Sequence, residues 1–282
     1  RRKERNYKNV NLDGKLISKA GVVVPLLGNE NSPEMLVEIG AALNKKEKIQ
    51  VINITEVPNQ ALLDAFMEEN PKITSLERRI SGLSKSKNID IDFEAAVTHD
   101  LSNTIYQLSE QTSCDWLVMS WNGRAHSGIL VSNPLGWLLT HIDSDFALFK
   151  DNGVRYFGKI LLAMRPGRKD KNFVAIADRI CNFYNASLTL LHIVPEDMSD
   201  LEFKKIEDSS RTTLSKATSK SEVIIQRSKD AIGAISKISA EYDLLILGTP
   251  QKDNWLNILF GPGKDKFADS SACSVLRLTV KD

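Results

Sequence analysis

Runs of apolar residues recur along the chain in an order that repeats once. The runs at 22–27 and 159–164 each open a half in which short stretches rich in Val, Ile and Leu alternate with longer helical patterns. Such alternation predicts parallel strands covered by helices. Near the end of each half an aspartate, Asp115 or Asp243, enters another apolar run, and its distance to the next Asn-Pro or Gly-Pro pair is the same in both. The repeat therefore predicts two copies of one domain.

The pattern predicts five strands and four helices in each half. In the first half the strands are expected at 22–27, 49–54, 90–96, 115–120 and 145–149, and the helices at 33–45, 59–85, 100–112 and 133–142. In the second half the strands are expected at 159–164, 187–194, 222–226, 243–248 and 273–280, and the helices at 170–184, 201–217, 230–240 and 263–270. Ser32-Pro33 is typical of a helix start, and Asp100 and Asp230 stand where helix caps are expected. With right-handed crossovers, this order predicts an α/β fold with a flavodoxin-like doubly wound parallel sheet in each half.

The same pattern sets the expected domains. Residues 1–20 form a basic lead, 21–154 the first copy and 155–282 the second. Each copy is long enough to have its own core. We expect the copies to be related by a pseudo-twofold axis and to associate through their closing strands, 146–149 and 275–280, because apolar edge strands need cover.

Composition argues against several classes of function. A net charge of +1 over 282 residues gives no field that would favour nucleic acid. Cys114, Cys181 and Cys273 are odd in number and have no CxxC spacing, which favours a reducing compartment without disulfides. The four histidines form no ligand pair, so no metal is expected, and His192 is expected to be a core residue at the end of a strand. No nucleophile–base pair or carboxylate dyad is present in the sequence pattern, so we expect no enzyme activity.

The first residues leave two interpretations open. The chain begins at Arg1 rather than Met, and five basic residues fall within its first eight positions. This cluster suits a solvated tail. It equally suits a segment just cytoplasmic of a transmembrane helix, where Lys and Arg accumulate, and we expect the chain to be part of a longer protein.

The first strand continues as Pro25-Leu26-Leu27-Gly28-Asn29, and the aspartate-led fourth strand is followed by a long loop. In these features the chain resembles the universal stress protein family, over both halves from about Gly21 to Val280. The ATP-binding members carry G-x2-G-x9-G-[S/T] in that loop, where backbone amides approach phosphates. The resemblance also implies an Asp at the end of the first strand that contacts adenine.

Both implied nucleotide sites depart from that motif. The three loop positions are Ser120, Gly123 and Asn133 in the first half and Gly248, Gln251 and Gly261 in the second. Pro134 and Pro262 stand where Ser or Thr would offer a backbone N–H to a phosphate. Leu27 and Arg165 replace the adenine-contacting Asp. We therefore expect no bound cofactor.

Large apolar side chains occupy the second loop instead. They are Trp255, Leu256, Ile258, Leu259 and Phe260. These residues either fold onto the carboxyl edge of their own sheet or form a contact surface for a partner. Because Trp and Phe commonly anchor interfaces, we expect a homodimer with this loop as the leading interface candidate.

Degenerate tandem stress-protein folds occur as cytosolic C-terminal domains of secondary transporters in the amino acid–polyamine–cation superfamily. Among these, the chain looks most similar to the C-terminal domain of the prokaryotic cation–chloride cotransporters. The resemblance implies a regulatory and dimerisation domain at the cytoplasmic face of the cell membrane, with the transmembrane domain of the same polypeptide as its partner. Two alternatives stay open, namely the tail of an amino acid permease and a free-standing tandem universal stress protein that binds ATP.

Overall fold

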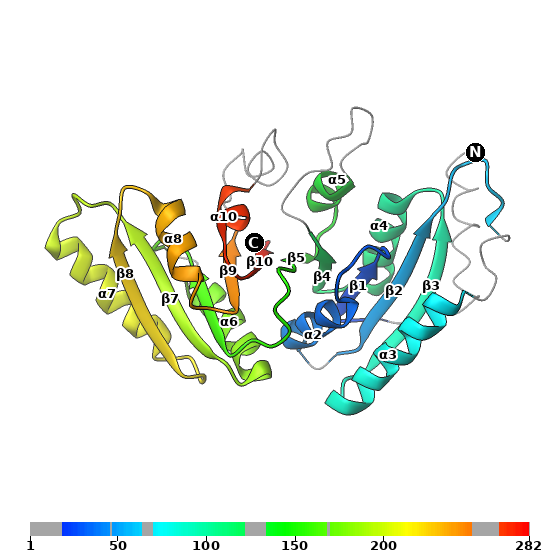
Figure 1. Ribbon diagram of the computed structural model, residues 1–282, viewed down its shortest axis with the longest axis horizontal. Coiled ribbons are helices and arrows are strands. Elements are labelled where there is room, and N and C mark those ends of the chain that lie inside the picture. Colours follow the sequence, from blue (N-terminus) through cyan, green and yellow to red (C-terminus); the bar gives the residue numbers. More distant parts are fainter. Residues whose placement is uncertain are drawn as a thin grey trace. The chain divides into compact units, whose positions relative to one another are not determined.

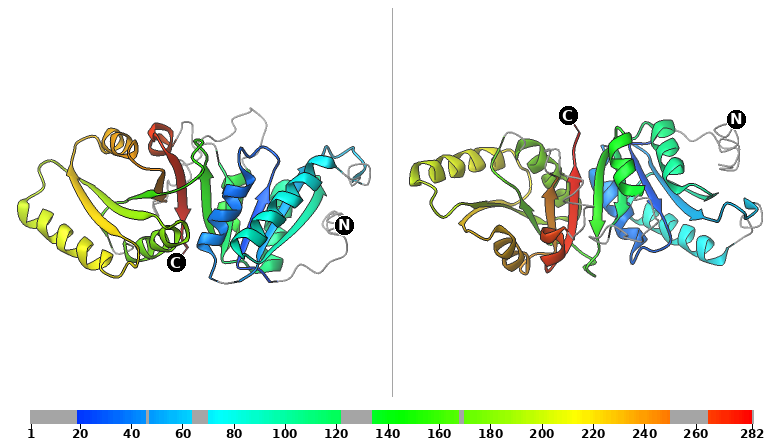
Figure 2. Two further views of the ribbon diagram at one scale, coloured as in Figure 1. Left: turned by 60° about the horizontal axis from the view of Figure 1, so that its bottom comes forward. Right: turned by 90° about the horizontal axis from the view of Figure 1, so that it is seen from above.

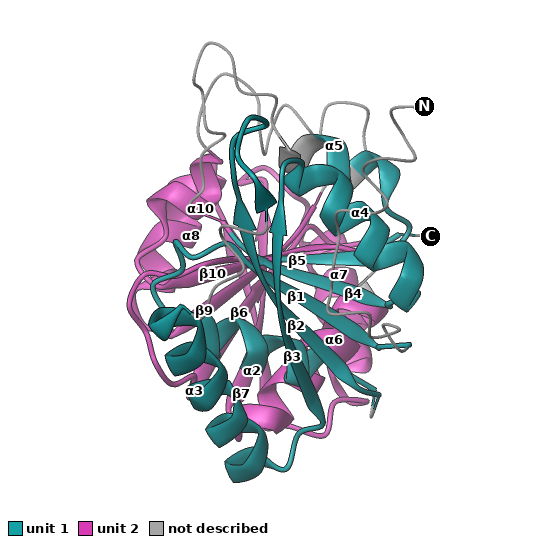
Figure 3. Cartoon of the chain, turned by 90° about the vertical axis from the view of Figure 1, so that its right-hand side faces the viewer, with its two compact units in different colours: residues 1–120, 128–147, 281 teal, residues 121–127, 148–280, 282 magenta. Residues whose placement is uncertain are grey.

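The computed structural model describes residues 19–45, 47–63, 70–121, 134–167, 170–249 and 265–281. The chain divides into two compact units. The first comprises residues 1–120, 128–147 and 281, and the second residues 121–127, 148–280 and 282. Figure 3 colours the first unit teal and the second magenta.

In the first unit, parallel strands are ordered β3-β2-β1-β4. Their bounds are Val22–Leu26 for β1, Ile49–Glu56 for β2, Ile91–Thr98 for β3 and Trp116–Ser120 for β4. The helices are α2 (Pro33–Leu43), α3 (Pro71–Lys87), α4 (Leu101–Thr112) and α5 (Pro134–His141). Strand β5 (Asp145–Lys150) lies next to β4 and contains the boundary between the units.

The second unit repeats this arrangement with the order β10-β9-β6-β7-β8. Its strands are β6 (Lys159–Ala163), β7 (Ser187–Val194), β8 (Ser221–Arg227), β9 (Leu244–Gly248) and β10 (Ser274–Thr279). Its helices are α6 (Asp170–Tyr184), α7 (Asp200–Leu214), α8 (Ala231–Ser239) and α10 (Lys266–Ser270).

Helices cover both faces of the strands in each unit (Figures 1 and 2). In the second unit α6 and α7 lie on one face and α8 and α10 on the other; in the first, α2 packs with α3, and α4 with α5. Because they are covered on both sides, the central strands are mostly apolar, and all of β1 is buried. The first strand of each unit lies between its second and fourth strands, so the order reverses there. Ligands bind at the carboxyl edge of such a reversal in doubly wound sheets.

The predicted doubly wound architecture is confirmed, and so are two helix caps. The Asp100 carboxylate accepts from the Asn103 N–H at 3.0 Å, and the Asp230 carboxylate accepts from the Gly233 N–H at 2.9 Å. Pro33 is the first residue of α2 as expected, but the Ser32 side chain makes no cap hydrogen bond. The predicted twofold relation of the copies and their association through the closing strands stay predictions.

The helix predicted at 59–85 is wrong at its start. Helix α3 begins at Pro71, and the Asn70 side chain caps it by accepting from the Lys72 N–H at 3.0 Å. A proline inside a helix removes a hydrogen bond, whereas at the first position its fixed φ favours the helical turn. Similarly, α10 begins at Lys266 because Asp265 caps it, while residues 263 and 264 of the predicted helix lie outside the described residues.

Candidate functional site at the carboxyl edges

In the first unit, the chain's own carboxylate occupies the turn that follows β1. The Leu27 N–H donates to Glu30 Oε1 at 2.5 Å, and the Gly28 N–H donates to Glu30 Oε2 at 2.9 Å. Gly28 has φ of +80°, a conformation that glycine adopts without strain. Successive N–H groups in such a turn form a concave site for anions. Leu27 stands where the resemblance implies an Asp that contacts adenine. Its backbone N–H is already hydrogen-bonded to Glu30.

In the second unit, different side chains, His192 and Arg165, lie at the end of β6. The His192 Nδ1 hydrogen-bonds to the Met164 carbonyl at 2.8 Å, and Arg165 is exposed just beyond. The His192 side chain is 0% exposed, as expected for a core residue. Its Nε2 has no hydrogen-bond partner among the residues that the structure describes. Arg165 presents a cation where the family motif has a carboxylate.

An aromatic ring lies against the first glycine of the second loop motif. Gly248 ends β9, and a Cβ atom built on it would lie 2.9 Å from the Phe173 ring. Phe173 comes from the first turn of α6 and is 7% exposed. A side chain at position 248 would make the Phe173 ring shift, which gives this glycine a structural reason independent of any phosphate.

A buried ion pair holds both ends of the second loop, residues 249–264. Arg277 on β10 donates from Nη1 to the Gly248 carbonyl at 2.8 Å and from Nε to Asp265 Oδ2 at 3.0 Å, and its Nη2 contacts the same carboxylate. Asp265 Oδ1 accepts from the N–H groups of Phe267 and Ala268 at 3.1 and 3.3 Å. Arg277 is 3% exposed and Asp265 0%. We call this pair and its contact with Gly248 the loop clamp.

Two of the six candidate loop positions fall within the described residues. Ser120 is the last residue of β4, and Gly248 is the last residue of β9. The other four loop positions and all five interface candidates lie outside the described residues; they are Gly123, Asn133, Gln251, Gly261, Trp255, Leu256, Ile258, Leu259 and Phe260.

Sequence reasoning missed Glu30, Phe173 and the loop clamp. Arg277 did leave a signal, since it is a charged residue between two leucines in strand β10. Charged residues are rarely fully buried unless they are paired, so its position could have indicated a buried partner of opposite charge. The identity of that partner, twelve positions earlier in the chain, carried no comparable signal.

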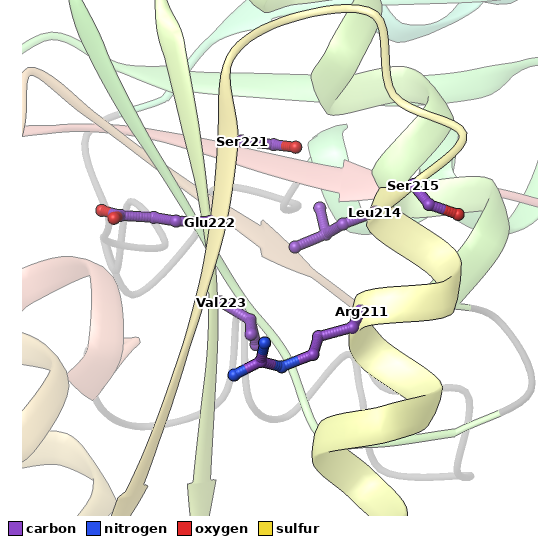
Figure 4. Close-up of a pocket in the computed structure, with 6 residues that line it drawn as sticks. All are labelled: Arg211, Leu214, Ser215, Ser221, Glu222 and Val223. Carbon is purple, nitrogen blue, oxygen red and sulfur yellow. The ribbon is translucent and has the colours of Figure 1, made fainter.

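A hollow of about 430 Å³ lies between the end of α7 and the start of β8 (Figure 4). Arg211, Leu214, Ser221 and Val223 are among its lining residues. Arg211 already pairs with Glu207 at 2.7 Å. The hollow is thus a surface groove without a set of converging free polar groups, and it is a weaker candidate than the carboxyl edges.

Other reactive groups in the described part of the chain are either buried or scattered. All three cysteines are buried and free, and burial raises the pKa of the Cys181 thiol to about 12. Among the residues that the structure describes, no three His, Cys, Asp or Glu side chains gather as a metal site would require. Within the same ranges, none of the helices has the length and apolar character needed to cross a membrane.

No protein-family model matches the chain, and no curated protein matches its sequence. Its fold, in contrast, matches several solved structures along nearly the whole chain. A universal stress protein from Archaeoglobus fulgidus matches with a TM-score of 0.61 at 15% identity, over 94% of this chain and 98% of that one. A protein of unknown function from Pseudomonas aeruginosa matches with a TM-score of 0.61 at 13% identity, over 93% of both chains.

The cytoplasmic domain of a prokaryotic cation chloride cotransporter also matches, with a TM-score of 0.58 at 12% identity, over 92% of this chain and 95% of that domain. At these identities the likeness shows the fold alone. The predicted tandem, universal stress protein-like α/β fold is therefore confirmed, and its relatives in structure include both stress proteins and a transporter domain.

Proposed function

We propose that this chain is a regulatory and dimerisation domain of a membrane secondary transporter of the cation–chloride cotransporter type, and that it is not an enzyme. The observation that carries the proposal is the state of the two carboxyl edges. At the end of β1, where the resemblance implies an adenine-contacting Asp, Glu30 engages the Leu27 and Gly28 N–H groups. In the second unit, Phe173 packs against Gly248, the first glycine of the loop motif. A doubly wound fold whose ligand edges are filled by its own side chains is suited to a structural role.

The solved cytoplasmic domain of a cation chloride cotransporter supports the choice of transporter, because the two chains match over nearly their full lengths. On this proposal the partners are the transmembrane domain of the same polypeptide and a second copy of the chain. The domain would then work at the cytoplasmic face of the cell membrane, where attachment to the bilayer raises the effective concentration of the two copies.

Fractionation of cells tests the transporter assignment. An antibody raised against this chain should detect, in cells of the source organism, a polypeptide larger than the chain. That polypeptide should stay in the membrane pellet after an alkaline wash and enter solution only with detergent. A band of the chain's own mass in the soluble fraction would contradict the proposal and favour the free-standing stress protein.

Sedimentation tests the dimerisation part separately. We expect the isolated chain to dimerise weakly, and a Trp255→Ala/Phe260→Ser variant to dimerise less while unfolding at a similar temperature. If the substitutions leave dimerisation unchanged, the interface does not involve these two residues. A wild-type chain that stays monomeric at high concentration contradicts dimerisation by the isolated domain.

A free-standing tandem stress protein that binds ATP is the second candidate, because the match to the Archaeoglobus fulgidus protein covers 98% of that chain. It predicts a soluble band in the fractionation and saturable nucleotide binding.

A further inference from the structure

We propose that the turn after β1 is a binding site for a small oxyanion, and that Glu30 keeps this site closed by occupying it. The ligand class is a phosphate or carboxylate group, which takes the place of the Glu30 carboxylate when that side chain swings away. This inference concerns only the first unit, and it starts from the same Glu30 contacts that the proposed function uses.

The geometry of the turn matches an oxyanion. Two adjacent N–H groups, those of Leu27 and Gly28, each donate to a different oxygen of one carboxylate, at 2.5 and 2.9 Å. A phosphate or an external carboxylate offers the same pair of oxygens on one atom. The positive φ of Gly28 orients the two donors toward a common point. The carboxylate of Glu30 therefore stands in for the anion that the turn is shaped to hold.

The occupant can be displaced. Glu30 is only partly buried, and its neighbours Gly28 and Asn29 are exposed. Within the described residues no lysine or arginine pairs with Glu30. Asp265 in the second unit differs, since it is fully buried and paired with Arg277. Moving Glu30 into water therefore breaks two hydrogen bonds but leaves no buried charge without a partner.

The turn also lies at the functional edge of its unit. It follows the strand that pairs with both β2 and β4, where the strand order reverses. The matching turn of the second unit cannot offer the same pair of donors, because Pro166 stands where the first unit has Gly28 and proline has no N–H. The first unit thus carries the oxyanion site alone among the described parts of the two edges.

Competition by Glu30 sets the expected affinities. A group tethered within a few residues has an effective concentration of millimolar or more. An external oxyanion must compete with that concentration in the wild type but not in a Glu30→Ala variant. Removing the carboxylate should therefore tighten binding of inorganic phosphate by about tenfold or more, into the low millimolar range expected of two charge-assisted hydrogen bonds.

Amide NMR of the full chain measures this directly. Inorganic phosphate is titrated at constant ionic strength into ¹⁵N-labelled wild type, Glu30→Ala and Glu30→Gln proteins, with sodium chloride alone as the blank. In Glu30→Ala the Leu27 and Gly28 amides should shift saturably, while the Gly40 amide should not move. The wild type should need at least tenfold more phosphate. A Glu30→Ala protein without saturable shifts, or a wild type that binds equally well, overturns the proposal.

Two glycine substitutions in the Glu30→Ala background provide matched controls. Gly28→Ala should abolish the phosphate response, because alanine disfavours a φ of +80°. Gly82→Ala, in open space on α3, should leave the response intact. Retained binding in the Gly28→Ala protein, with its fold verified by the rest of the spectrum, would count against the turn as the site.

A parallel titration with ATP identifies the source of the oxyanion. Equal affinity for ATP and inorganic phosphate means that only the phosphate group is recognised, as the proposal expects. Binding of ATP a hundredfold tighter would keep the oxyanion site but overturn the account of both nucleotide edges as incompetent. The two claims thus fail on different results.

Discussion

Replacing Arg277 with methionine tests the loop clamp of the second unit. The substitution keeps most of the side-chain volume but leaves the Asp265 carboxylate, which is 0% exposed, without its cation. The Gly248 carbonyl loses its donor as well. Removing one partner of a buried ion pair costs about 3–5 kcal/mol, and we expect the free energy of unfolding of the second unit to fall by that amount.

A second substitution separates the charge from the contacts. Asp265→Asn removes the charge but keeps a side-chain oxygen that caps α10, because Asn is as good a helix cap as Asp. In the Arg277→Met/Asp265→Asn protein neither charge is left buried alone. We therefore expect the double variant to be more stable than the sum of the single effects predicts, with a coupling energy of about 2 kcal/mol or more.

Urea unfolding of the four proteins, followed by circular dichroism, gives the free energies. The control is Arg211→Met, which breaks the exposed pair of Arg211 with Glu207 on the same unit; Arg211 is 67% exposed, and such pairs contribute less than about 1 kcal/mol. An Arg277→Met effect no larger than this control refutes the reasoning. Strict additivity of the two substitutions would likewise show that the charges are not coupled.

Three further predictions concern the second unit. Asp178→Asn should lower stability at neutral pH by about 1.5–3 kcal/mol, because the carboxylate accepts hydrogen bonds from Thr218 and Ser219. Burial acts to raise the pKa of Asp178, but these hydrogen bonds outweigh it and lower the pKa. The stabilisation is therefore present above about pH 4 and lost as the pH falls below it, and the difference between wild type and variant in thermal unfolding should shrink over that acid range; a difference that is constant with pH would contradict this. The Cys181 and Cys273 thiols should not react with a thiol reagent at pH 8 until the protein unfolds, since burial raises the pKa of both, that of Cys181 to about 12; rapid labelling of either thiol in the native protein, located by mass spectrometry, would contradict it. Gly248→Ala should lower stability by about 1–3 kcal/mol through overpacking against the adjacent aromatic ring, and an unchanged melting temperature would show that the ring moves freely.

Hydrophobic patterning was sufficient to predict the architecture, because buried parallel strands leave continuous apolar runs and the repeat doubles the signal. Strand β7 was predicted at its observed bounds, Ser187–Val194. The start of α3 was missed because periodicity alone does not reveal that Pro71 opens a helix rather than interrupting one. Helix boundaries depend on single capping residues, and hydrophobic periodicity over a whole helix does not reveal them.

For the carboxyl edges, the sequence predicted only that the residues of the nucleotide motif are missing. Leu27 and Arg165 were recognisable as departures from a motif. The contacts that the structure shows at these edges were not recognisable. The Glu30 contact depends on one side-chain rotamer and on the φ of Gly28. The Arg277 contacts join β10 to a residue that precedes α10 and to the end of β9. Contacts of this kind follow from the folded geometry, and neither residue spacing nor composition encodes them.

The central claim is that the departures from the nucleotide motif at both carboxyl edges leave the chain without a nucleotide site. Isothermal titration of the wild-type chain with ATP and magnesium tests it most directly. The account predicts no saturable heat at sub-millimolar nucleotide. A one-to-one isotherm with micromolar affinity would contradict it and give first place to the nucleotide-binding stress protein.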